Sequence, residues 1–159
     1  MMNTTSGSSH DCWNEVALIT GAVDLIGTQH AAVLLETSAR VIISDKDRIK
    51  LDHAKKALSS ANPEDCIIVE LLDVTNSDNI EVINEKYCID ILVNNAAVDP
   101  KVDRDVNKLK SSSFENFSEK SWKLDLDVGI VWSFFYWYFS SDHKFVTSTT
   151  FTVYEWQTI

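Results

Sequence analysis

The stretch Thr20-Gly-Ala-Val-Asp-Leu-Ile-Gly27, preceded by the apolar run Val16 to Thr20, decides the fold class. A short β-branched run that ends in a glycine turn and enters a dense apolar segment, here Ile26 to Thr37, predicts a strand followed by a buried helix. Such a turn places the N–H groups and the positive dipole end of the helix where a phosphate can bind. Its glycines avoid side chains that would block the close approach of a pyrophosphate.

The same alternation of strand and helix continues along the chain. Further strands are predicted at Arg40 to Ser44, Cys66 to Val74 and Ile89 to Val93. The first intervening helix has an apolar stripe made of Leu51, Ala54 and Leu58. The second is opened by the capping box Thr75-Asn-Ser-Asp78 and has Ile80, Ile83 and Tyr87 along one face. This alternation predicts an α/β fold with a parallel sheet.

The regular pattern weakens after Asn94. A polar segment running to about Lys120 predicts a long surface loop with a short helix. Trp122 to Phe139 has the length of a helix, although its aromatic and β-branched content also suits a strand, and Phe145 to Tyr154 favours a strand. We therefore expect a disordered lead at 1–14, one α/β domain at 15–140 and a divergent tail at 141–159.

Composition limits the partners and the cellular location. The 159 residues include 14 basic and 24 acidic side chains, a net charge of −10 that would repel nucleic acid and anionic lipid surfaces. The longest apolar stretch, Val128 to Phe139, is too short to span a bilayer. Cys12, Cys66 and Cys88 lack paired metal-site spacing, which favours a reduced, cytoplasmic protein. The four histidines share no ligand spacing, so no metal site is predicted.

Polar groups follow the other predicted strands. Asp45 closes the second strand, 24 residues after Gly21, where a carboxylate can accept hydrogen bonds from a ribose and repel a 2′-phosphate. This position favours NAD over NADP as the cofactor. Asp73-Val74 and Asn94-Asn-Ala-Ala97 follow the third and fourth strands, at the edge where open α/β sheets bind ligands.

The segments Leu18-Ile-Thr-Gly-Ala22, Ile26-Gly27, Asp73-Val-Thr75 and Ile89-Asp-Ile-Leu-Val-Asn-Asn-Ala96 occur in an order and spacing that resembles the short-chain dehydrogenase/reductase family. The resemblance covers roughly 16–134. It implies an oxidoreductase with a Rossmann-like, doubly wound parallel sheet, incomplete here with about four to five strands. It also implies cofactor-binding roles for pyrophosphate-lining Gly21, Ile26 and Gly27, ribose-binding Asp45, adenine-bordering Asp73 and Val74, and Asn95 with Ala96 near the adenosine ribose.

The sequence departs from the family pattern in the phosphate turn. Leu25 replaces the middle glycine of Thr-Gly-x-x-x-Gly-x-Gly, whereas the alignment Thr-Gly-x-x-Gly-x-x-Gly places Asp24 at the missing glycine. Either alignment loses one glycine and puts the affinity for the cofactor in doubt. Further along, Ala97 ends the Asn-Asn-Ala-Gly element, and Gly129 stands where the catalytic asparagine is expected.

The family's Tyr-x-x-x-Lys pair, in which the lysine lowers the pKa of a catalytic tyrosine, does not occur. The residues four positions after Tyr87, Tyr136, Tyr138 and Tyr154 are Ile91, Ser140, Asp142 and Thr158. We therefore expect NAD binding without hydride transfer and assign no catalytic residue.

Two alternatives remain open. In the first, a partner chain or unrecognised substitutes, such as Ser148 and Tyr154, supply the missing acid and base. In the second, the chain is a non-catalytic interaction module whose aromatic helix at 130–139 binds a partner or forms a homo-oligomer; that helix is otherwise a solubility liability. The composition shift after about Asp127 is typical of a truncated or frame-shifted gene.

Overall fold

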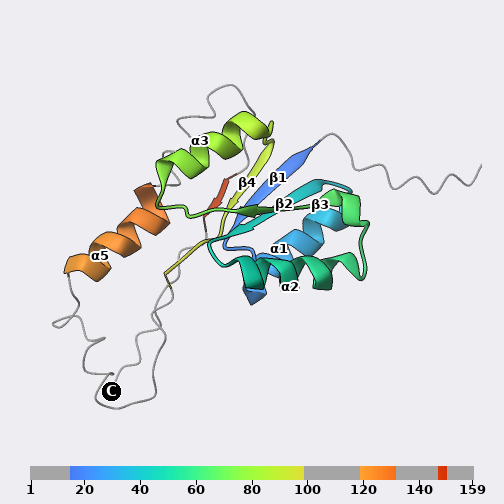
Figure 1. Cartoon of the computed structure of the whole chain (residues 1–159), viewed down its shortest axis with the longest axis horizontal. Coiled ribbons are helices and arrows are strands. Elements are labelled where there is room, and N and C mark those ends of the chain that lie inside the picture. The colour runs from blue at the N-terminus through green and yellow to red at the C-terminus, as the bar shows by residue number, and fades with distance from the viewer. Residues whose placement is uncertain (1–14, 99–118, 132–146, 150–159) are drawn as a thin grey trace, which may run out of the picture.

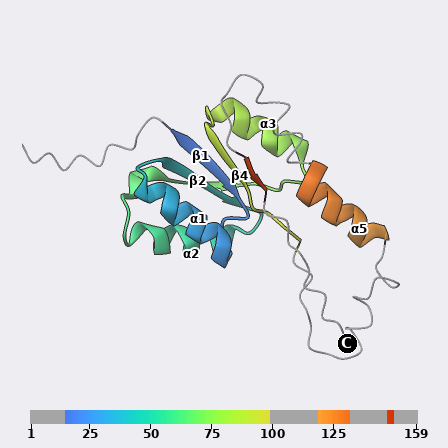
Figure 2. The same ribbon diagram turned by 180° about the vertical axis from the view of Figure 1, so that it is seen from behind.

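The computed structural model describes residues 15–98, 119–131 and 147–149. Its centre is a five-stranded sheet in the order β3-β2-β1-β4-β5, and every paired strand runs parallel to its neighbour. Helices α1 and α2 lie on one face of the sheet and α3 lies on the other (Figures 1 and 2). The predicted α/β, Rossmann-like architecture is confirmed.

The strands are short and their register is regular. Their bounds are β1 Val16–Thr20, β2 Arg40–Asp45, β3 Ile67–Leu71, β4 Ile91–Asn94 and β5 Thr147–Thr149. Thr20 at the end of β1 pairs with Ser44 of β2, and Ile19 pairs with Val93 of β4. Because parallel strands share a direction, their carboxyl ends come together at one edge of the sheet.

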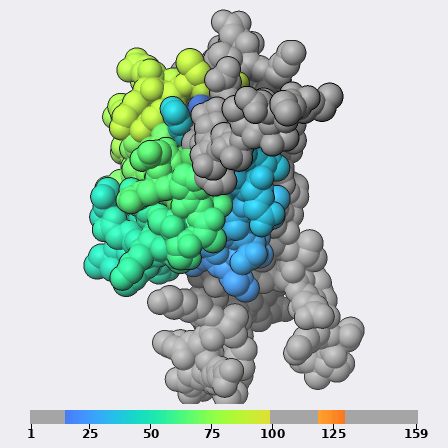
Figure 3. Space-filling model, turned by 90° about the vertical axis from the view of Figure 1, so that its right-hand side faces the viewer, coloured from blue at the N-terminus to red at the C-terminus, as the bar shows by residue number. Residues whose placement is uncertain are grey.

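The helices connect these strands. Their bounds are α1 Leu25–Glu36, α2 Arg48–Ser59, the 3-10 helix η1 Glu64–Cys66, α3 Ser77–Lys86, α5 Glu119–Leu126 and the π-helical turn η4 Asp127–Val131. The apolar stripe Leu51, Ala54 and Leu58 of α2 is buried, as predicted. Each of α1, α2 and α3 begins near the carboxyl edge and returns to the amino edge. Figure 3, seen from the right of Figure 1, shows α2 beside the η1 region.

Two apolar clusters lie on opposite faces of the sheet. Ala17, Ile19, Val41 and Ile43 pack with α1 and α2, whereas the alternating residues Leu18 and Ile42 pack with α3. Side chains that follow one another along a strand point to opposite faces, so strands covered on both sides need continuous apolar sequence. This explains why β1 and β2 were predicted nearly residue for residue.

Element ends differ from the predictions by a few residues. The third strand starts and stops inside the predicted run because Cys66 closes η1 and the chain leaves the sheet after Leu71. The cap of α3 is Asn76, whose side chain accepts the N–H of Asp78, rather than Thr75. The Thr75 hydroxyl instead donates to Asp73, so the predicted capping box was displaced by a local turn.

The carboxyl-terminal predictions are tested in part. The described portion of the predicted segment Trp122 to Phe139 is helical, and β5 lies within Phe145 to Tyr154. The lead at 1–14, the loop at 99–118 and the aromatic run at 132–139 lie outside the described residues. Cys66 is disulfide-bonded and Cys88 is a free thiol, so the prediction that every cysteine is reduced is wrong for Cys66. Within the described ranges no helix has the length and apolarity to cross a membrane.

Candidate nucleotide-binding site

Hydrogen bonds tie four strand ends into one continuous edge. The Ala22 N–H donates to the Ser44 carbonyl at 3.0 Å and joins the end of β1 to β2. The Leu72 N–H donates to the Asp45 carbonyl at 3.0 Å and joins β2 to the segment after β3. Since the predicted site residues all follow these strands or open α1, the structure brings them to the same edge of the sheet.

The Thr20 hydroxyl connects this edge to β4. It accepts the N–H groups of Asn95 and Ala96, both at 3.1 Å, and it donates to the Val93 carbonyl at 3.4 Å. The Asn95 side-chain amide also donates to the Gly21 carbonyl at 2.9 Å. Thr20 is buried and holds the segment after β4 against the phosphate turn. Thr20 is not among the predicted site residues, although a hydroxyl that ends an apolar strand directly before a glycine is a signal for such a role.

The two glycines of the turn are required by the packing of the protein itself. Gly21 has φ +64°, and a Cβ there would lie 2.8 Å from the Ala96 Cα. A Cβ at Gly27 would lie 2.5 Å from the Gly21 carbonyl oxygen and 2.7 Å from the Ala22 Cα. Protein atoms thus fill the space that a side chain would need at either position, and the expected role of these glycines beside a pyrophosphate stays a prediction. The two glycines allow α1 and the segment after β4 to approach β1 closely.

The N-terminus of α1 lacks the cap that α2 and α3 have. Asp47 caps α2 by accepting the N–H groups of Ile49 and Lys50, and Asn76 caps α3. Asp24 occupies the corresponding position of α1, but its side chain makes no capping hydrogen bond. Its carboxylate lies 3.8 Å from the Lys50 ammonium group instead. Within the part of the chain that the structure describes, the first N–H groups of α1 therefore point to the carboxyl edge without a side-chain acceptor.

Asp45 is half-buried at the end of β2. Its side chain accepts the Asp47 N–H at 2.9 Å. Burial raises the pKa of the Asp45 carboxyl, and the negative charges of Asp24 and Asp47 act in the same direction, whereas the Asp47 N–H and the charge of Lys50 oppose them. The Asp45 carboxylate is thus held partly out of water, and its expected contact with a ribose stays a prediction.

Asp73 and Val74 lie after the end of β3. The Asp73 carboxylate accepts both the hydroxyl and the N–H of Thr75, at 2.7 and 2.9 Å. The hydroxyl bond is the largest influence on the pKa of Asp73; with the N–H bond and the charge of Lys46 it lowers that pKa despite some burial. Val74 packs against the cluster on the α3 face. Asp73 thus offers a fixed acceptor beside an apolar side chain.

The residue that departs from the family pattern in the phosphate turn is exposed to solvent. Leu25 is 78% exposed and Ile26 is 54% exposed, in the first turn of α1. Leu25 is the residue that replaces the family's middle glycine, so its side chain stands at the mouth of the uncapped helix end. This exposed leucine therefore contributes little to the apolar core.

The only tyrosine in the described ranges, Tyr87, forms a cluster with Glu70 and Lys86. It follows α3, and its hydroxyl donates to the Glu70 carboxylate, which also accepts the Lys86 ammonium group at 2.7 Å. Burial and the Glu70 hydrogen bond raise the pKa of Tyr87, although Lys86 acts against them. For Glu70, the two hydrogen bonds outweigh burial and lower the pKa. The cluster joins α3 to β3.

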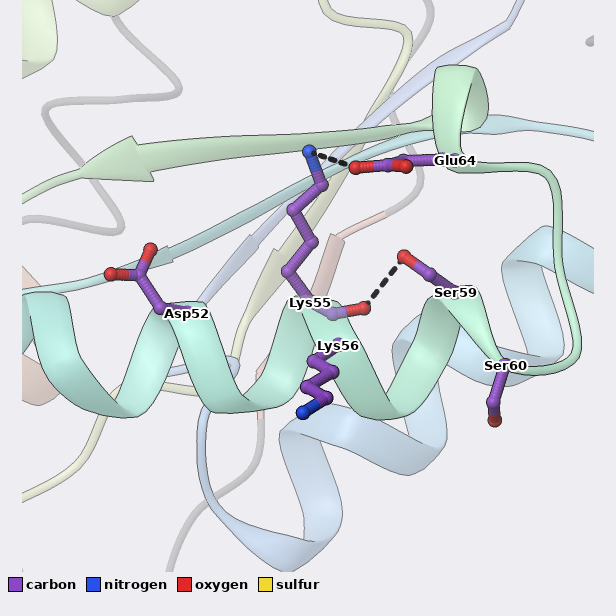
Figure 4. A pocket seen from close by; sticks show the side chains of 6 residues that line it. All are labelled: Asp52, Lys55, Lys56, Ser59, Ser60 and Glu64. Atoms are coloured by element: carbon purple, nitrogen blue, oxygen red, sulfur yellow. Dashed lines mark hydrogen bonds and ion pairs between the residues drawn. The ribbon is translucent and has the colours of Figure 1, made fainter.

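A surface hollow beside α2 is separate from the carboxyl edge (Figure 4). It is lined by Asp52, Lys55, Lys56, Ser59, Ser60 and Glu64. Lys55 pairs with Glu64 at 3.1 Å, and the Ser59 hydroxyl donates to the Lys55 carbonyl at 2.8 Å. Asp52 in turn pairs with Arg48 of the same helix at 3.2 Å. No metal-binding cluster of His, Cys, Asp or Glu occurs in the parts of the chain that the structure describes.

Known proteins of similar sequence and structure carry the same fold. An uncharacterized oxidoreductase of Staphylococcus saprophyticus is 27% identical over 122 residues, which are 74% of this chain and 47% of that protein. The chain thus spans about half the length of that curated relative.

Two solved structures extend the likeness. An NADPH-bound short chain oxidoreductase of Pseudomonas aeruginosa with an atypical catalytic center superposes with a TM-score of 0.66, at 24% identity over 80% of this chain and 48% of the other. A 3-ketoacyl-(acyl-carrier-protein) reductase of Brucella melitensis, complexed with NADH, superposes with a TM-score of 0.62. It is 21% identical over 77% of this chain and 47% of the other. The short chain dehydrogenase family model matches residues 15–131. The chain belongs to the short-chain dehydrogenase/reductase family.

Proposed function

We propose that this chain binds NAD(H) at the carboxyl edge of its sheet and does not itself transfer hydride. The observation that carries the proposal is the uncapped N-terminus of α1, which leaves N–H donors and a positive dipole end free above the phosphate turn. An anion is the natural partner of such a helix end. A pyrophosphate is such an anion, and it is part of the NADPH and NADH that two structurally similar proteins bind.

The remaining site residues support the adenosine half of the ligand. Asp45 provides a half-buried carboxylate for the ribose, and Asp73 provides an oriented acceptor near the adenine, with Val74 as its apolar neighbour. Asn95 and Ala96 lie beside the phosphate turn, where they donate hydrogen bonds to Gly21 and Thr20, respectively. These positions agree with the roles expected from the family resemblance.

Asp45 favours NAD over NADP in this proposal. The solved neighbours include both an NADPH and an NADH complex, so the shared fold does not select between the two. A carboxylate at the end of β2 accepts a hydrogen bond from a free 2′-hydroxyl, whereas it repels a 2′-phosphate. Asp24 and Asp47 add further negative charge around Asp45. The local field therefore opposes the more highly charged cofactor.

The proposal that this chain does not transfer hydride rests on the missing Tyr-x-x-x-Lys pair. A bound nicotinamide supplies the hydride chemistry, but the family pattern also needs a tyrosine with a lowered pKa, and the sequence holds no Tyr-x-x-x-Lys. The pKa of Tyr87 is raised by burial and by the hydrogen bond that its hydroxyl donates to Glu70. Among the described residues Tyr87 is the only tyrosine, and Ile91 stands at the position where a lysine would be needed to lower its pKa.

A titration of the purified full chain with NADH tests this function. Energy transfer from the five tryptophans to the reduced nicotinamide reports binding, and Asp45→Ala is the matched variant. We expect saturable binding that weakens in the variant, and weaker binding of NADPH than of NADH. Activity is then assayed with alcohol and carbonyl substrates, and no turnover is expected. A folded protein that shows no binding at millimolar NADH contradicts the proposed site.

A further inference from the structure

The side chain of Asp24 is an unfavourable neighbour for a phosphate. It occupies the N-cap position of α1 without capping the helix, and it is 75% exposed. A carboxylate there competes with a ligand phosphate for the same N–H groups and the same dipole end. It also adds a like charge at the helix end where the pyrophosphate is proposed to bind, and water screens such repulsion only in part.

Lys50 lies beside Asp24 and comes from a different helix. Its ammonium group is 3.8 Å from the Asp24 carboxylate, and its side chain is 57% exposed. The backbone N–H of Lys50 is fixed by the Asp47 cap of α2, so the capping of one helix places a cation at the end of the other. Asp24 and Lys50 also both lie close enough to Asp45 to act on its pKa, which the charge of Asp24 raises and the charge of Lys50 lowers.

An exposed pair at this distance contributes little to folding. Its effect is greater on a charged ligand, since the net charge next to the α1 N-terminus changes from −1 to about 0 when Lys50 accompanies Asp24. We propose that Lys50 determines the affinity of the nucleotide site by neutralising Asp24 at the uncapped end of α1. This inference rests on the proposed function and adds a residue that lies outside the phosphate turn.

A double-mutant cycle tests the pairing. Kd for NADH is measured at low ionic strength for the full-length wild type, K50M, D24N and D24N/K50M. Methionine keeps the apolar stem of lysine and removes its charge, and asparagine keeps the shape of aspartate. We expect K50M to raise Kd on the order of three- to tenfold and D24N to lower it, because the uncompensated repulsion of unit charges at such distances is of that size. In the D24N background, K50M should change Kd less than about twofold.

The matched control is K56M. Lys56 is an exposed lysine on the same helix, near its other end beside the hollow of Figure 4, so its loss changes the net charge equally at a remote site. K56M should leave Kd unchanged within error. The K50M effect should also shrink in 0.5 M salt, where the Debye length falls to about 4 Å.

The outcomes separate this inference from the proposed function. Equal losses from K50M in both backgrounds would mean that Lys50 contacts the ligand directly and would overturn the neutralising role, as would equal losses from K50M and K56M. Failure of all four proteins to bind NADH would overturn the proposed function itself, and this inference with it. The pKa of Asp45, followed by NMR in the unliganded proteins, provides an independent readout. It should rise in K50M and fall in D24N, and the absence of either change would contradict the coupling.

Discussion

The first turns of α1 and α2 begin at the same edge of the sheet, yet they treat their N–H groups in opposite ways. In α2, Asp47 accepts two backbone N–H groups and closes the helix end. In α1, Asp24 has an equally suitable side chain but directs it to Lys50. A cap stabilises a helix by roughly 1 kcal/mol, so leaving one unmade needs a compensating reason. We propose that the ligand anion of the proposed nucleotide site is that reason.

The most damaging change in this comparison is Gly21→Ala in the turn before α1. The new Cβ meets the backbone of Ala96 at 2.8 Å, and the residue must keep φ +64°. We expect a loss of about 2 to 4 kcal/mol in the free energy of unfolding, since left-handed strain and overpacking add. Urea unfolding followed by circular dichroism measures this loss.

Gly129→Ala is the matched control, because a Cβ there meets no atom within 4 Å. It should stay within about 0.5 kcal/mol of wild type. Comparable losses from both substitutions would show that the close approach at Gly21 is unimportant for stability.

The caps themselves give the second prediction. Asp47→Ala should lower the free energy of unfolding by about 1 kcal/mol, because the N–H groups of Ile49 and Lys50 lose their acceptor. Asp24→Ala removes no cap and only an exposed ion pair, so it should change stability by less than about 0.5 kcal/mol. Asp47→Ser should recover most of the loss. If Asp24→Ala and Asp47→Ala lowered the free energy of unfolding equally, the conclusion that only α2 is capped by its aspartate would be wrong.

The sequence predicted the sheet better than the details of this edge. The two-faced burial of β1 and β2 imposes continuous apolar runs, so these strands were recognisable in isolation. The cap of α3 was misplaced because Thr75 and Asn76 are both good capping residues, and only the Asp73 turn decides between them. Contacts between segments far apart in the sequence, such as Thr20 with Asn95, leave no periodic signal. Lys50 was overlooked for the same reason, since its partner lies on another helix.

A third prediction concerns the exposed leucine at the open helix end. Leu25→Gly restores the family's middle glycine and removes a side chain that is 78% exposed at the start of α1. NADH binding should tighten roughly three- to tenfold, equivalent to about 1 kcal/mol, because ligand atoms gain access to the N–H groups. The matched variant is Ile49→Gly, which removes a similarly exposed side chain from the first turn of the capped helix α2. If both variants bind NADH as wild type does, Leu25 does not obstruct the site.

The smallest effect is expected from Asp45→Asn, which separates folding from binding. Because burial raises the pKa of Asp45, the folded protein holds this proton more tightly than the unfolded chain does. That stabilisation is complete below the unfolded pKa of about 3.9 and is lost as the pH rises through the folded pKa. At neutral pH the buried charge is therefore a cost to folding, which asparagine removes while its side-chain oxygen still accepts the Asp47 N–H.

The unliganded variant should accordingly unfold at a slightly higher temperature than wild type at pH 7, by an amount that declines towards pH 3. Its affinity for NADH should fall, and its preference for NADH over NADPH should weaken. Thermal unfolding at several pH values, with and without NADH, measures both effects. A variant that is less stable than wild type at pH 7 would show that Asp45 serves the fold. A variant that is more stable but binds NADH more weakly would mean that the Asp45 carboxylate, like the open end of α1, is maintained for a ligand at some cost to stability.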